Sequence, residues 1–197
     1  MKVIGLTGGI GSGKSTLSRL LGVIGIPVYI ADNESKRLTE SSPVICEKLT
    51  EKFGADLYTE GKLNKTLLAS LIFTNEANRN FVNSVIHPIV RMDFEKWKAR
   101  HAQFPFVFIE TAILFETGYF NHVDVSVTIA APEELRIQRV ELREGWSKES
   151  ILSRMKSQFP EEEKIRHSDY VIYNDDRQAL IPQVEKIMTT VSLLPAR

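Results

Sequence analysis

The chain has 197 residues, of which 43% are hydrophobic, enough for one compact unit or for a core with inserted lobes. Its 25 basic and 25 acidic side chains cancel, so no global field draws it to nucleic acid or to an acidic membrane surface. The single cysteine excludes an internal disulfide framework, and the longest apolar run, residues 20–31, is too short to span a bilayer. We therefore expect a cytoplasmic protein without nucleic-acid or membrane partners.

The first strand, loop and helix are predicted over residues 2–24. Residues 2–7, KVIGLT, are typical of a short buried strand that uses the apolar residues near the N-terminus, so we expect no signal peptide here. Residues 7–16 read TGGIGSGKST and fit the phosphate-binding pattern G-x-x-x-x-G-K-[ST]. Leucines and isoleucine then recur at helical spacing up to Ile24, and Gly25 follows as a C-terminal cap. This order of elements is the one that a phosphate-binding loop requires.

Each residue type in this loop has a chemical reason. Glycines let the backbone wrap a phosphate so that N–H groups point inward, and the helix that follows turns its positive end toward the same anion. Lys14 supplies charge for the β- and γ-phosphates, and the Ser15 hydroxyl is the usual Mg²⁺ ligand. The alternative without a binding function is a glycine-rich turn with a surface lysine. We expect nucleotide phosphates to be bound by Gly8, Gly9, Gly11, Ser12, Gly13, Lys14, Ser15 and Thr16.

A long helical region follows the second strand. Residues 27–30 form that strand, which ends at Ala31-Asp32, and the pattern is then helical to about residue 104, without a convincing strand. One helix is expected to begin at Ser42-Pro43 and to end before Gly54, and another covers residues 65–73. A third spans residues 75–101 and should be interrupted around His87-Pro88, because proline removes a backbone donor.

Three further strands are predicted over residues 106–109, 124–130 and 169–173. Between the second and third of these, Pro132 opens a charged helix to about residue 144, and Ser147 caps a helix extending to Phe159. Pro160 starts a further helical turn, and a last helix covers residues 178–188. Five apolar strands separated by helices indicate a parallel, doubly wound α/β sheet flanked by helices.

Two connections in this sheet are too long to be simple crossovers. We read them as helical lobes over the carboxyl ends of the strands, where such sheets bind ligands. The core would then comprise residues 1–32, 105–131 and 168–197, the first lobe residues 33–104 and the second lobe residues 132–167. A switch GTPase would need Asp-x-x-Gly after a strand and Asn-Lys-x-Asp, and neither motif occurs. The lobes favour a small-molecule kinase, which must exclude water from the transferred phosphate.

Several segments together resemble the dephospho-coenzyme A kinase family. They are residues 7–16, Ala31-Asp32, His87-Pro88, Ile113 to Glu116, Arg139, Arg143, Gln158 and residues 169–174. The chain departs from the family's pattern at Ile30, often aspartate, and at Ala112-Ile113, often Pro-Leu. The resemblance extends to about residue 188 and implies a single P-loop NTPase-fold domain with a five-stranded sheet of order 2-3-1-4-5, strands being counted along the chain. It also implies an acceptor-binding first lobe and a lid.

The activity that the resemblance implies is transfer of the γ-phosphate of ATP, with Mg²⁺, to the ribose 3′-hydroxyl of dephospho-coenzyme A, the last step of coenzyme A synthesis. Asp32 would then bind the acceptor and take its proton as general base; from the residues alone, a helix N-cap is an equal alternative. His87 would lie near the acceptor, unless it is a structural histidine before a helix break.

The predicted lid contains arginines that could act on the transferred phosphoryl group. Arg136, Arg139 and Arg143 recur at i, i+3 and i+7 on one helix face, which is either a solvated face or a source of charge for the transferred phosphoryl group. The resemblance favours Arg139 and Arg143 as catalytic together with Lys14, and Arg154 is a weaker candidate.

Two residues after strands complete the expected site. Glu110 would hold Mg²⁺ through water, or is a plain strand-end carboxylate, and Asn174 would lie near the adenine, or in an ordinary turn. A monomer is favoured. Two alternatives stay open: another kinase of this architecture, acting on a nucleoside, a monophosphate or a sugar acid, and a nucleotide-dependent binding switch.

Overall fold

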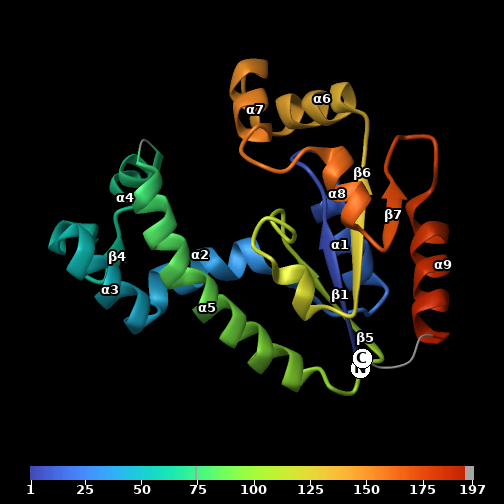
Figure 1. Ribbon diagram of the computed structural model, residues 1–197, viewed down its shortest axis with the longest axis horizontal. Coiled ribbons are helices and arrows are strands. Elements are labelled where there is room, and N and C mark those ends of the chain that lie inside the picture. The colour runs from blue at the N-terminus through green and yellow to red at the C-terminus, as the bar shows by residue number, and fades with distance from the viewer. Residues whose placement is uncertain (74, 194–197) are drawn as a thin grey trace. The chain divides into compact units, whose positions relative to one another are not determined.

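The computed structural model describes residues 1–73 and 75–193. The chain divides into two compact units (Figure 1). The first unit contains Met1–Ile30 and the chain from His101 onward, and the second contains Ala31–Arg100.

The first unit is built on a five-stranded parallel sheet. Its strands are β1 (Lys2–Thr7), β2 (Val28–Ile30), β5 (Phe106–Glu110), β6 (Val125–Ala130) and β7 (Tyr170–Tyr173). They lie in the order β2-β5-β1-β6-β7, and every neighbouring pair is parallel. Counted along the chain, this is the order 2-3-1-4-5, so the predicted sheet is confirmed.

The register of these strands brings three chain segments to one edge of the sheet. Glu110 is the partner of Leu6 on one side and of Ile30 on the other. The glycine-rich loop begins two residues after Leu6, and the chain leaves β2 directly after Ile30. The carboxyl ends of the strands, where ligands of such sheets bind, therefore carry the loop and the Glu110 carboxylate together.

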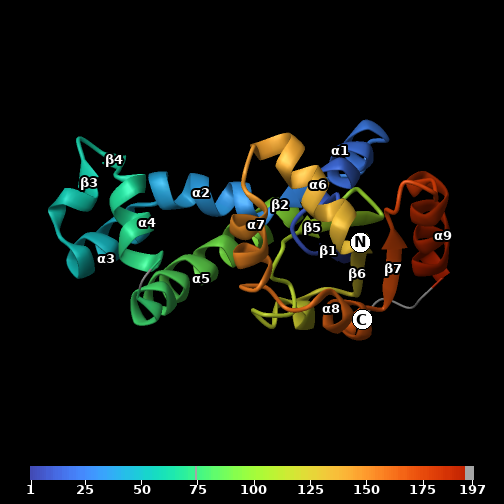
Figure 2. The same ribbon diagram turned by 90° about the horizontal axis from the view of Figure 1, so that it is seen from above.

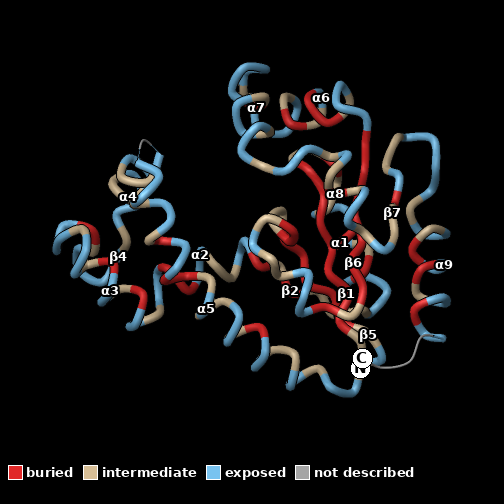
Figure 3. The backbone as a smooth tube through the Cα atoms, in the orientation of Figure 1, coloured by how far each residue is buried: buried red, intermediate tan, exposed pale blue. Residues whose placement is uncertain are grey.

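Helices surround the sheet of the first unit. They are α1 (Lys14–Val23), α6 (Glu133–Glu144), α7 (Lys148–Met155), α8 (Glu161–His167), α9 (Leu180–Leu193) and the short 3₁₀ helix η2 (Tyr119–His122). The α9 face with Val184, Ile187 and Val191 packs onto the strands, and its other face is exposed (Figure 3). Figures 1 and 2 show α6 and α7 beyond the carboxyl ends of the strands.

The helices predicted for this unit are present, but α1 ends at Val23 with Ile24 as its cap, and α9 extends five residues beyond the predicted end at residue 188. α6 follows Pro132 and ends at Gly145, which has left-handed backbone angles, and the Ser147 hydroxyl caps α7 by accepting the Ser150 N–H. The helix does not extend to Phe159, however, because α7 ends at Met155. Proline disfavours helical angles in the preceding residue, and Pro160 follows Phe159 directly.

The second unit is helical. It contains α2 (Ala31–Ser41), α3 (Pro43–Phe53), the 3₁₀ helix η1 (Ala55–Leu57), the strands β3 (Tyr58–Thr59) and β4 (Lys62–Leu63), α4 (Lys65–Phe73) and α5 (Glu76–Arg100). The expectation of no strand here was wrong, because β3 and β4 form an antiparallel hairpin. Its turn has positive φ at Glu60 and Gly61, and strands of two residues are too short to show an alternating pattern.

The predicted interruption at Pro88 is also wrong, because α5 is continuous through it. Pro88 and Ser84, four residues earlier, are both exposed, so the helical turn that loses its hydrogen bond faces water. On the opposite face Val82, Val85 and Ile86 are buried in the core of the second unit. Tertiary packing therefore outweighs the local cost of the proline.

Within the residues described, no helix combines the length and the apolar character that a membrane crossing needs.

Candidate active site

The phosphate loop, residues 8–15, wraps as the sequence predicts. Gly11 and Gly13 have φ angles of 78° and 101°, which side chains rarely adopt. The Ser12 N–H turns back to the Gly9 carbonyl at 3.2 Å, and the N–H groups of Thr16 and Leu17 in α1 donate to the Gly13 carbonyl. The backbone between β1 and α1 is thus a tight turn that leads into a helix N-terminus.

Lys14 spans this turn. Its ammonium donates to the carbonyls of Gly8 at 2.7 Å and Gly9 at 3.2 Å. Two buried hydroxyls of the same segment, Thr7 Oγ1 and Ser12 Oγ, have no hydrogen-bond partner among the described residues. Buried hydroxyls are ordinarily hydrogen-bonded, so these two fit a polar ligand at the loop.

The residues that would hold Mg²⁺ also lie on this edge. Glu110 is 4% exposed at the end of β5 and accepts a hydrogen bond from Ser18 Oγ at 3.3 Å. Ser15 lies three residues before Ser18, on the same face of α1. Mg²⁺ usually keeps several waters and takes few protein ligands beside substrate phosphates. One hydroxyl and one buried carboxylate fit that ion, and the described residues contain no cluster of three or more His, Cys, Asp or Glu that could hold a metal.

Helix α6 packs directly on the loop, and this explains two glycines that the pattern leaves free. A Cβ atom built at Gly9 would lie 2.3 Å from Arg136 Nη1, and one at Gly11 would lie 2.3 Å from the Arg136 carbonyl oxygen. At Gly9 the obstacle is the end of a side chain, whereas at Gly11 it is backbone. Sequence reasoning did not find this contact, because it depends on where α6 docks.

We predict that Gly11→Ala weakens ATP binding about 10-fold or more, because the methyl group must displace the backbone of α6. The matched control is Gly25→Ala, where φ is also positive, at 81°, and nothing lies within 4 Å of the added Cβ. Titration calorimetry with ATP measures both variants. Equal ATP affinities in Gly11→Ala and Gly25→Ala would contradict the role given to the contact between Gly11 and α6.

The three arginines of α6 lie in three different environments. Arg136 is 7% exposed and pairs with Glu161 at 3.2 Å. Arg139 is half-buried and pairs with Asp176 at 2.6 Å, and its Nη1 is buried without a partner among the described residues. Arg143 is exposed and pairs with its neighbour Glu144. The structure therefore separates a buried arginine against the loop from two that lie further out.

Glu161 orients Arg136. Its other oxygen accepts the Ala131 N–H at 3.0 Å. Burial raises the pKa of the Glu161 carboxyl, against the lowering effect of the Arg136 charge. Arg154 lies over the ring of Trp146 at 4.1 Å and is exposed, which is a packing arrangement on the surface.

Asn174 also holds the loop. Its Nδ2 donates to the Ser12 carbonyl at 2.8 Å, close to where a Cβ at Gly13 would lie. The turn after it is fixed by Asp175, which accepts the N–H groups of Arg177 and Gln178, and these hydrogen bonds lower the pKa of the Asp175 carboxyl. Asn174 thus lies against the phosphate loop.

Two of the expected site residues belong to the second unit. Asp32 is exposed in the first turn of α2, two residues after β2 ends, and so lies inside the helix and not before it. His87 is half-buried in α5, and burial lowers its pKa from the ordinary value of 6.5.

The lowered pKa of His87 predicts acid sensitivity. Well above pH 6.5 the histidine is neutral in both the folded and the unfolded state, and the full stability is present. As the pH falls through that value the unfolded chain takes up the proton first, so stability declines until the folded-state pKa is passed. We expect the Tm of the wild type to fall more than that of His87→Gln between about pH 7.5 and about pH 5.5. If the Tm of the two proteins fell by the same amount, the lowered pKa of His87 would be contradicted.

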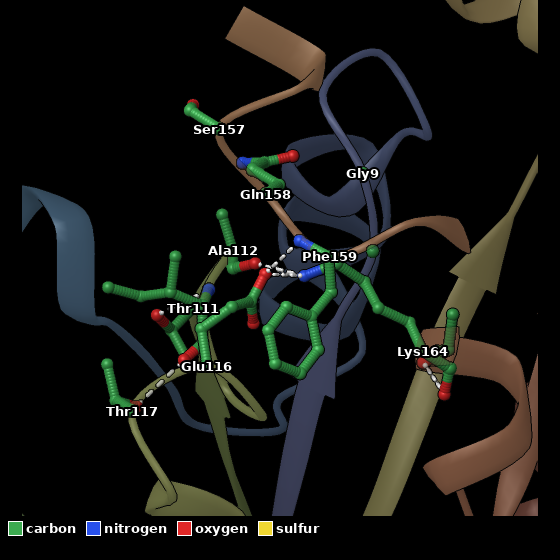
Figure 4. A network of polar contacts seen from close by, with 12 residues as sticks. Gly9, Thr111, Ala112, Glu116, Thr117, Ser157, Gln158, Phe159 and Lys164 are labelled. Atoms are coloured by element: carbon green, nitrogen blue, oxygen red, sulfur yellow. Dashed lines mark hydrogen bonds and ion pairs between the residues drawn. The ribbon is translucent and has the colours of Figure 1, made fainter. Parts of the chain in front are cut away.

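Sequence reasoning gave no role to a buried network below the loop (Figure 4). Lys164 has a wholly buried side chain whose ammonium donates to Glu116 Oε1 at 2.5 Å and to the Ala112 carbonyl at 2.7 Å. Burial lowers the pKa of Lys164, and the Glu116 carboxylate opposes that shift. No signal in the sequence marks this lysine, because it stands in a charged stretch, EEEKIR, that is typical of an exposed helix.

Comparison with known proteins agrees with this geometry. Residues 2–179 match the family model described as dephospho-CoA kinase. A dephospho-CoA kinase of Bacteroides fragilis is 43% identical over 94% of this chain and 90% of its own length, and one of Porphyromonas gingivalis is 41% identical over 97% and 95%. The crystal structure of a Thermus thermophilus protein superimposes with a TM-score of 0.83 at 34% identity, over 98% of both chains. The chain belongs to the dephospho-CoA kinase family.

Proposed function

We propose that this protein transfers the γ-phosphate of ATP to the ribose 3′-hydroxyl of dephospho-coenzyme A. The observation that carries the proposal is the phosphate loop with Lys14 bonded across it, at the same sheet edge as Glu110, in a chain of this family. The reaction forms the bond between the acceptor oxygen and the γ-phosphorus and breaks the bond to the β,γ-bridging oxygen. ADP leaves with the electron pair of that bond, and the acceptor proton passes to a base.

The roles of the loop residues follow from their chemistry. The loop N–H groups and the N-terminus of α1 bind the phosphates, with Lys14 adding a positive charge for the β- and γ-phosphates. Mg²⁺ would be held by Ser15 and, through water, by Glu110, and when bound it would neutralise phosphate charge. Because the transition state is loose, charge neutralisation by Lys14 and Arg139 should contribute at least as much as the base.

Asp32 is the proposed base. It follows β2 by two residues at the carboxyl edge of the sheet, and its side chain is exposed in the first turn of α2. General-base catalysis typically contributes about 10²- to 10⁴-fold. His87 would contact the acceptor from α5, which makes residues 33–104 the acceptor-binding lobe.

Residues 132–167 are the proposed lid, with Arg139 and Arg143 as its catalytic arginines and Asn174 beside the nucleotide at the loop. We also propose that the protein acts as a monomer in the cytoplasm. The lid would exclude water, which otherwise competes with the acceptor for the γ-phosphate.

A coupled assay for ADP release with a panel of acceptors tests the proposal. We expect turnover with dephospho-coenzyme A and only background ADP release with nucleosides, nucleoside monophosphates and sugar acids. Preferred turnover of one of the other acceptors would assign a different kinase of the same architecture. ATP binding without acceptor-dependent turnover would assign a binding switch.

A further inference from the structure

The segment between α7 and α8, residues 156–160, is hydrogen-bonded both to the phosphate loop and to Glu116, which follows β5. We call this segment the connector. Gln158 Oε1 accepts the N–H of Ile10 in the phosphate loop at 3.1 Å. The next N–H along the chain, that of Phe159, donates to Glu116 Oε1 at 2.9 Å. Figure 4 shows Gln158 on the loop side of the connector and Glu116 on the other side, with Phe159 between them. The connector therefore bonds the loop and the segment after β5 at once.

Ile10 is well suited to be a point of attachment for the loop. The phosphate-binding pattern leaves its position free. Its side chain packs against the small core between α6 and α7, formed by Ile137, Val140 and Ile151. Its N–H is directed to Gln158, so both the side chain and the backbone donor of this loop residue are bound by the α6–α8 segment. The loop conformation and the position of the connector are thus physically linked.

The Glu116–Lys164 pair fixes the other side of the connector. Glu116 Oε1 receives both the Phe159 N–H and the Lys164 ammonium, and Lys164 also donates to the carbonyl of Ala112, two residues after β5 ends. The Lys164 side chain is 0% exposed and that of Glu116 is 15% exposed. Buried ion pairs are weak sources of net stability, and their best-attested use is to specify one arrangement.

We propose that Gln158 is a positioning residue for the phosphate loop and that the Glu116–Lys164 pair positions Gln158. The hydrogen bond to Ile10 holds the loop in the conformation whose remaining N–H groups converge on the nucleotide. Without it a smaller fraction of the protein has a binding-competent loop, and the apparent Kd for ATP rises by the inverse of that fraction. This inference rests on the proposed function for the identity of the nucleotide.

The first test replaces Gln158 by methionine, which keeps the length of the side chain and removes the amide acceptor. We expect the Kd for ATP, measured by titration calorimetry without acceptor, to rise about 3- to 10-fold, the value of one hydrogen bond. The KM for dephospho-coenzyme A should stay within about 2-fold, because the lost contact lies on the donor side. A merely structural role would lower the Tm and leave the Kd unchanged.

A neighbouring residue supplies the matched control. Ser157 lies next to Gln158 in the connector and is exposed, and its hydroxyl donates to the Arg154 carbonyl within its own turn. Ser157→Ala should leave the Kd for ATP and the Tm unchanged. An unchanged Kd in Gln158→Met, or the same change in both variants, overturns the role of Gln158.

The second test concerns the ion pair. Glu116→Leu and Lys164→Met are combined in one chain, because removal of one partner alone would leave an uncompensated buried charge. We expect this double variant to show the same rise in the Kd for ATP as Gln158→Met. Adding Gln158→Met to it should then give no further rise, because both changes act through one hydrogen bond.

These outcomes test the role of Gln158 and the role of the ion pair separately. If the rise in the Kd for ATP in the triple variant equals the product of the rises in Gln158→Met and in the double variant, the role of the ion pair is overturned. If the double variant does not fold, Gln158→Met alone still tests the hydrogen bond to Ile10. Wild-type ATP binding without turnover of dephospho-coenzyme A would contradict the proposed function, and the Kd comparisons would still decide the inference about the loop.

Discussion

Asp32→Asn is expected to lower kcat by about 10²-fold or more while ATP binding stays unchanged. The amide has the shape of the carboxylate but does not accept the proton of the acceptor hydroxyl. Asp32 is exposed in the first turn of α2, so the substitution leaves no buried group without a partner and should fold normally. Steady-state kinetics with dephospho-coenzyme A, together with calorimetric titration of ATP, measure the two quantities separately.

The same helical turn provides the control for Asp32. Glu34 is the other acidic residue in the first turn of α2, so Glu34→Gln removes the same charge from the same helix N-terminus. We expect kcat to change less than about 3-fold in this variant, because the helix-terminus effect of one carboxylate and the Glu34–Arg37 surface ion pair are both small. If Asp32→Asn left kcat unchanged with chemistry rate-limiting, Asp32 would not be the base.

Arg139→Ala is expected to lower kcat by about 10³-fold, with a much smaller loss of ATP affinity. Its partner Asp176 is 65% exposed, and such ion pairs hold a side chain weakly. The Arg139 guanidinium also has a buried nitrogen with no partner in the described part of the chain, a group that a phosphoryl oxygen would satisfy. Lys in this place keeps the charge but not the planar fork, so Arg139→Lys should recover only part of the activity.

Asp176→Ala is the control for Arg139, since it removes the ion pair and keeps the arginine. Its kcat should stay within about 2-fold of the wild type. Arg143→Ala should also lower kcat more than it weakens ATP binding. If the two arginine variants lost ATP affinity and retained kcat, both arginines would be nucleotide clamps and not transition-state groups.

Local signals were sufficient for most of the fold. Strand, loop and helix over residues 2–24 follow from apolar spacing and glycine positions, and the buried strand that ends at Glu110 begins with a continuous apolar run, residues 106–109. Two features of the second unit escaped these signals. A hairpin of two-residue strands has no period to detect, and the helix through Pro88 is held by packing of its apolar face.

The sequence predicts those parts of the candidate site whose residue types and spacing belong to a motif with a known chemical role. Lys14, Ser15 and the pattern glycines were identified from their spacing alone, whereas Gly9 and Gly11 are explained by the docking of α6 on the loop. Lys164 illustrates why the rest was missed. A lysine in an acidic stretch reads as an exposed residue, and only the tertiary fold buries it against Glu116.

The most direct test of the proposed activity is the identity of the phosphorylated product. Wild-type protein is incubated with ATP, Mg²⁺ and dephospho-coenzyme A, and the product is analysed by ³¹P NMR. We expect a new phosphomonoester on the ribose 3′-oxygen, formed in a one-to-one ratio with ADP. A phosphate at any other position, or ADP formed together with free phosphate and unchanged dephospho-coenzyme A, would contradict it.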